Sequence, residues 1–135
     1  MTYEWTKVEL FGSNNDGDPI RFTCASGTAI TKGTLLAMTD PRTAIAHSSA
    51  GQAIAGVAAM DKQSNDGSTT ISAWTNGIFE VTASAAVTVG WPVISAAQGN
   101  TVDPGTAQSG AFIIGYAMES ASAGEVINVR LKVGG

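Results

Sequence analysis

Charged residues are scarce in this chain of 135 residues, at 13% of the sequence, against about a quarter in an average soluble domain. The seven Lys and Arg residues are scattered along the chain, and the net charge is −4. A nucleic-acid-binding protein neutralises phosphates with clustered Lys and Arg side chains. The composition therefore argues against DNA or RNA as a partner.

Residues that usually carry chemistry are scarce as well, with one cysteine, Cys24, and one histidine, His47. A single cysteine excludes an intrachain disulfide, and one Cys with one His does not make a zinc site. We interpret Cys24 as a small buried side chain and His47 as an exposed loop residue. A Cys24–His47 dyad is the alternative, but no motif around Cys24 supports it.

Acidic motifs for metal binding or hydrolysis are also missing. The stretch 14–18 resembles a calcium loop, but Gly12 and Thr23 stand where that loop needs acidic ligands, so we interpret it as a surface turn. Glu80 and Glu119 lie in apolar stretches, and we expect both to face solvent at strand edges. We therefore predict a protein that is not an enzyme and has no metal ion or cofactor, with a small hydrolase as an alternative.

Long apolar runs are absent. The N-terminus has neither the basic nor the apolar region of a signal peptide, and no run approaches the roughly 20 residues of a membrane span. We expect a chain that is made and folded in the host cytoplasm and has no membrane partner.

What the sequence does contain is β-prone segments and turns. The runs 70–74 and 78–81 flank Asn76 and Gly77, and Asn-Gly between two such runs is typical of a hairpin with a type I′ turn. We predict that turn at Asn76 and Gly77, with Trp74 opposite Phe79. The apolar run 53–60 before it predicts a buried strand.

A pattern of three short segments occurs twice in the same order, about 57 to 59 residues apart. This spacing predicts two similar β-units, residues 29–81 and 86–133, packed face to face because each alone is too small to bury a core. We expect one small, mainly β domain with little helix. The paired segments are 29–36 with 86–93, 54–58 with 113–117, and 67–73 with 124–129.

Residues 1–26 differ from the rest, and we expect an extended N-terminal arm and loop there, ahead of a β-rich domain at 27–135. A short aromatic-bearing strand followed by a loop can add itself to the sheet edge of a neighbouring subunit. In the alternative, Tyr3 and Trp5 pack back on their own domain. The arm model predicts binding to a capsid or to another subunit through Tyr3, Trp5, Val8, Leu10 and Phe11.

Five segments of the chain together resemble the head decoration (capsid cement) proteins of tailed bacteriophages. They read Gly-Asp-Pro-Ile-Arg at 17–21, Ile-Thr-Lys-Gly-Thr-Leu-Leu at 30–36, Ile-Ala-Gly-Val-Ala-Ala at 54–59, Ser-Thr-Thr-Ile-Ser at 68–72 and Asn-Gly-Ile-Phe at 76–79. The resemblance spans about three quarters of the chain.

The resemblance implies a small β-barrel or β-tulip-like domain that assembles as a homotrimer and bridges subunits of the major capsid protein. The function it implies is that of a structural virion protein that stabilises the capsid against the pressure of packaged DNA. The acidity of the chain suits the outer face of the capsid better than a DNA-lined interior. An alternative function is that of a β-rich binding module that recognises carbohydrate or a host surface through its tryptophans.

Overall fold

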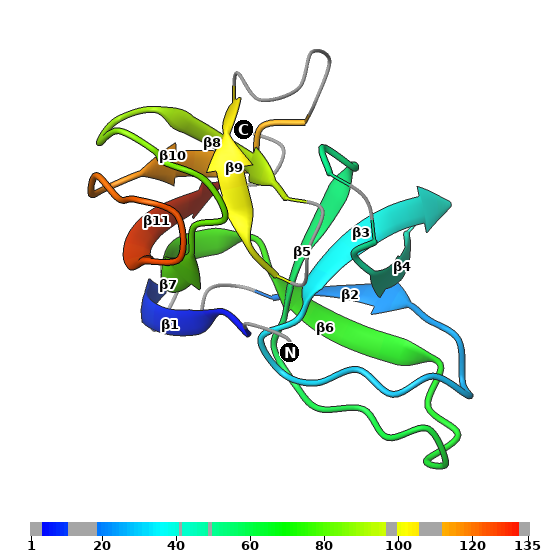
Figure 1. Cartoon of the computed structure of the whole chain (residues 1–135). Coiled ribbons are helices and arrows are strands. Elements are labelled where there is room, and N and C mark those ends of the chain that lie inside the picture. Colours follow the sequence, from blue (N-terminus) through cyan, green and yellow to red (C-terminus); the bar gives the residue numbers. More distant parts are fainter. Residues whose placement is uncertain are drawn as a thin grey trace.

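The computed structural model describes residues 4–10, 19–40, 42–48, 50–96, 100–105 and 112–132. These residues form eleven strands and no α-helix, and the strands make a closed barrel beside a six-stranded sheet (Figure 1). The prediction of a small, mainly β fold is confirmed.

The barrel is built from five strands in the order β2-β4-β3-β5-β6. A single parallel pairing, Thr23 with Thr43, closes it, and the other pairs are antiparallel. Small side chains dominate its interior, because a barrel of few strands leaves little room inside. The strands are β2 (Ile20–Thr23), β3 (Leu35–Asp40), β4 (Thr43–Ala46), β5 (Ile54–Ala58) and β6 (Thr70–Trp74), and the interior holds Phe22, Cys24, Ile30, Leu36, Ala44, Ala55, Ala58, Ile71 and Ala73.

The sheet has the order β1-β7-β11-β10-β8-β9. An isolated parallel bridge between Ala83 and Val102 brings β9 back to the end of β7, so the sheet curls toward a second barrel. On β11 the side chains alternate as the pleat requires, with Ile127, Val129 and Leu131 buried. The strands are β1 (Thr6–Leu10), β7 (Asn76–Thr82), β8 (Pro92–Ser95), β9 (Val102–Pro104), β10 (Gly115–Ala117) and β11 (Val126–Lys132).

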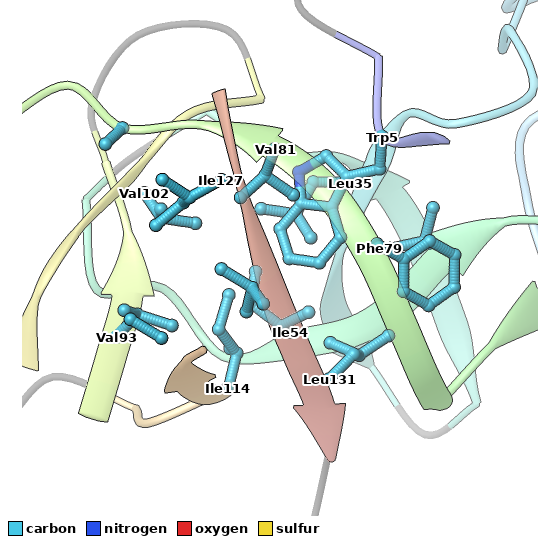
Figure 2. Close-up of a cluster of buried hydrophobic side chains, with 14 of the residues drawn as sticks. Trp5, Leu35, Ile54, Phe79, Val81, Val93, Val102, Ile114, Ile127 and Leu131 are labelled. Carbon is cyan, nitrogen blue, oxygen red and sulfur yellow. The ribbon is translucent and has the colours of Figure 1, made fainter. Parts of the chain in front are cut away.

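A second and larger core joins the sheet to the barrel. Leu35, Ile54, Val57 and Trp74 point outward from the barrel and pack among the inward side chains of the sheet, as Figure 2 shows for Leu35 and Ile54. The two halves therefore share one apolar core, and neither can separate without exposing it.

The two halves repeat one plan. In each, the first strand pairs with the last, and the second strand lies between the third and the fourth: β2-β6-β5-β3-β4 in the barrel and β7-β11-β10-β8-β9 in the sheet. The loops repeat too: Gly33 N–H donates to the Ala58 carbonyl, and Gly90 N–H donates to the Ala117 carbonyl. We place one unit at β2–β6 and the other at β7–β11, with the boundary at Thr75.

The predicted hairpin is wrong. β6 pairs with β2 and β5 of the barrel, whereas β7 pairs with β1 and β11 of the sheet, so Asn76 and Gly77 lie inside a strand. The Asn-Gly signal is local, and long-range pairing overrides it. Glycine is needed at position 77 for another reason: φ is 155°, and a Cβ there would lie 2.7 Å from the Glu9 carbonyl oxygen of β1.

Two glycines at equivalent places in the units allow neighbouring strands to approach closely. A Cβ on Gly56 would lie 2.5 Å from the Trp74 carbonyl oxygen, and a Cβ on Gly115 would collide with the carbonyl oxygen of Arg130. Trp74 and Arg130 occupy the same register position in the two units, since Trp74 pairs with Val57 and Arg130 with Tyr116.

We predict that Gly115→Ala lowers the free energy of unfolding by about 1–3 kcal/mol, because the new methyl group forces β10 away from β11. Urea unfolding followed by tryptophan fluorescence measures the change. Gly27→Ala is the matched control, since a Cβ at Gly27 meets nothing within 4 Å. Equal midpoints for the two variants would contradict the close approach.

Candidate functional site

The residues singled out for possible chemistry lie apart from one another in the described part of the chain. Within the ranges that the structure covers, no three His, Cys, Asp or Glu residues lie close enough to hold a metal ion. Cys24 lies inside the barrel, whereas His47 is half-buried and donates its backbone N–H to Leu35. No helix in the described part of the chain is long and apolar enough to cross a membrane.

The most buried charge, Lys62, closes one end of the barrel. Its Nζ donates to the carbonyl oxygens of Ser26 and Thr28 at 3.0 and 2.8 Å, and its backbone exchanges two hydrogen bonds with Ile30. Burial raises the pKa of the Cys24 thiol beneath this loop, and the positive charge of Lys62 offsets part of that rise. Lys62 therefore has a structural role, that of tying the loop 24–30 to the loop after β5.

We predict that Lys62→Met lowers the free energy of unfolding by about 1–3 kcal/mol, because two carbonyl groups lose a charged donor. Amide hydrogen exchange should accelerate by a larger factor in residues 24–30 than in β11, because the loop opens locally whereas β11 opens only with the whole fold. Lys132→Met, on an exposed lysine, is the control. Slow exchange in both variants would show that Lys62 does not hold the loop.

The N-terminal strand packs against its own domain. The backbone N–H of Trp5 donates to the Gly33 carbonyl oxygen at 2.8 Å, and its indole Nε1–H donates to the backbone oxygen of Asn100 at 2.8 Å. The indole ring lies 5.7 Å from the ring of Phe79, centroid to centroid. The residues after Trp5 then continue as β1, which pairs antiparallel with β7.

The residues predicted to bind a partner therefore divide into three groups. Trp5 and Leu10 belong to the core, with 3% and 6% of their surface exposed, so the alternative in which Trp5 packs on its own domain is what the structure shows. Val8 is 52% exposed and remains open to a partner. Tyr3 and Phe11 lie outside the described residues.

We predict that Trp5→Ala lowers the free energy of unfolding by about 3–5 kcal/mol, because it removes a large side chain from the shared core. Val8→Ser should change it by less than about 0.5 kcal/mol, since Val8 is exposed. Chemical denaturation of both variants measures the difference. A Trp5→Ala protein as stable as the Val8→Ser protein would mean that this strand does not belong to the core.

Exposed apolar side chains gather where β8 meets β10. A groove of about 370 Å³ is lined there by Gly90, Pro92, Ile113, Gly115, Tyr116 and Lys132. Ile113 is 49% exposed and Tyr116 is 43% exposed, and Trp91 beside the groove is 46% exposed. Sequence reasoning did not single out Ile113 or Tyr116, although their place in the second copy of the repeat carried the signal.

The fold and its surface define a class: a β domain with an exposed apolar groove, a feature typical of proteins that bind other proteins. A family model for the phage cement protein matches residues 15–133, and the chain belongs to that family. The resemblance found in the sequence is thereby confirmed. The protein is a capsid-associated structural protein of a phage.

The solved structures include a similar fold. The crystal structure of the N base of head fiber gp8.5 in bacteriophage phi29 matches with a TM-score of 0.54 and 21% identity, over 84% of this chain and 94% of that chain. At this identity the likeness shows a shared fold. No curated protein sequence matches the chain.

Proposed function

We propose that this protein binds the outer surface of a phage capsid and stabilises it against the internal pressure of packaged DNA by bridging subunits of the major capsid protein. Membership of the phage cement family is the observation that supports this proposal. In this proposal the protein acts through binding and not through catalysis.

The stabilising effect is mechanical. A molecule in contact with two shell subunits adds its own contact energy to the cost of separating them, provided that the molecule itself does not yield. The shared core of barrel and sheet supplies this stiffness, because Leu35 and Val57 of one unit are fully buried among side chains of the other. A load applied to one unit therefore reaches the other directly.

The protein acts as a homotrimer, so each particle attaches at several points at once. Multivalent attachment turns weak single contacts into a long-lived complex without any new chemistry. A low content of charge favours this arrangement, since few ions need to be desolvated when the protein docks. The acidic net charge suits the outer face, away from the packaged DNA.

Recognition of carbohydrate or a host surface is a second candidate function. The exposed aromatic rings of Trp91 and Tyr116 favour it, because sugars stack on such faces. A glycan array separates it from capsid binding: signals that disappear in Trp91→Ala would support this function, and an array without signals would count against it.

We predict that shells assembled without this protein bind it with saturation at a fixed number of copies, and that decorated shells retain DNA to a higher temperature than bare ones. Sedimentation measures the occupancy, and release of a DNA dye on heating measures the retention. Electron cryomicroscopy of decorated shells places the density on the outer or the inner face. A protein that leaves the shells bare at micromolar concentration would overturn the proposal.

A further inference from the structure

The outer face of the first unit carries a row of three paired residues that is entirely covered. Leu35 pairs with Val57, and Val57 pairs with Trp74, so all three point to the same side of the barrel wall. Their exposed fractions are 0%, 0% and 6%. The second unit and the N-terminal strand cover this row.

The second unit carries the same row in the same register. Pro92 pairs with Tyr116, and Tyr116 pairs with Arg130, as the three covered residues of the first unit pair with one another. Here the row is open, with Pro92 exposed, Tyr116 43% exposed and Arg130 half-buried. Ile113 is 49% exposed, whereas its counterpart Ile54 is 6% exposed.

The glycines beside the two rows differ in the same way. Gly33 and Gly90 share a left-handed backbone conformation, with φ of 91° and 86°. Trp5 lies against Gly33, and a Cβ there would come within 2.7 Å of the Trp5 carbonyl oxygen. Nothing in the described part of the chain lies within 4 Å of a Cβ on Gly90.

We propose that the groove between Gly90 and Lys132 is the capsid-binding site of this protein, and that it takes an extended segment of the major capsid protein with a large apolar side chain next to a carboxylate. This inference rests on the function proposed above and names the surface that carries it out. The capsid segment lies along the groove beside Gly90 of the second unit as residues 4–6 lie beside Gly33 of the first.

The chemistry of the occupant follows from the covered copy. At the first unit the covering strand places the Trp5 side chain in the core, with Glu4 directly before it, and both line a pocket with Lys32. At the second unit Ile113 and Tyr116 offer the apolar surface. Val89 stands at the place of Lys32, and the cation that lines this groove is Lys132 at the end of β11. An apolar residue beside a carboxylate matches both features.

The N-terminal strand of a second copy of this chain does not fit as the occupant. Trp5 and Leu10, the large apolar residues of the strand that covers the first unit, are 3% and 6% exposed in their own domain. A neighbouring copy would have to withdraw its own β1 from β7 to supply that strand, which would expose its shared core.

The test uses the full-length protein and purified phage shells that lack it. We expect Tyr116→Ser and Ile113→Ser each to weaken shell binding about tenfold or more, as the loss of a central interface residue does. Both residues are exposed, so the unfolding midpoint should stay that of the unchanged protein. Ile45→Ser is the matched control, since Ile45 is 39% exposed on β4 of the other unit and should leave binding unchanged.

The outcomes separate the two proposals. If the unchanged protein binds shells and both groove variants bind equally well, the groove is not the site, while the capsid function stands. If the unchanged protein does not bind, both proposals are overturned.

A cross-linking experiment keeps the inference testable should a groove variant fold poorly. A photoreactive phenylalanine analogue at the exposed position 113 should cross-link to the major capsid protein on decorated shells. Cross-linking only to a second copy of this chain, or no cross-link on shells that are fully occupied, would overturn the inference.

Discussion

Asn100 joins three parts of the chain that are far apart in the sequence. Its backbone oxygen accepts the indole N–H of Trp5, and its side-chain oxygen accepts the backbone N–H of Leu35, each at 2.8 Å. Both bonds are buried, and a buried N–H without a partner costs about 1–3 kcal/mol. The N-terminal strand, the barrel and the second unit are thus joined at a single residue, through its backbone and its side chain, next to the shared core.

The shared core also explains why two similar units have different surroundings. The first unit closes into a barrel whose interior is filled mainly by small side chains, so much of its apolar surface points outward at Leu35, Val57 and Trp74. The second unit fills its own interior with that outward face and with Trp5. Among the described residues nothing covers the corresponding face around Tyr116, which is 43% exposed, whereas Val57 is fully buried. The two units therefore differ in what covers the same face.

The mainly β fold class could be predicted from the sequence because β-prone runs and turn residues recur along the chain. Gly56 of β5 and Gly115 of β10 stand at the same place in the two units. Each is needed because a neighbouring strand lies too close for a Cβ atom. The strand through Asn76 and Gly77 could not be predicted, because an Asn-Gly pair reads the same in a tight turn and inside a strand. Here the glycine is needed because it lies against the backbone of β1. The strand that begins at Trp5 could pack on its own domain or reach a neighbouring subunit as an arm, and both cases show the same alternation of side chains. Only the tertiary contacts distinguish them.

The groove was beyond sequence reasoning for a related reason. Val57 and Tyr116 stand at the same place in the repeated segments 54–58 and 113–117. The sequence does not show that the structure buries Val57 and leaves Tyr116 exposed. Once the structure shows that Val57 is buried, the matching surface around Tyr116 becomes a candidate for binding. The groove around Tyr116 lies on paired strands, so it is ordered before binding, and a preformed surface needs little rearrangement to bind. Under the function proposed above, this preformed surface and the continuous core behind it together oppose the separation of shell subunits.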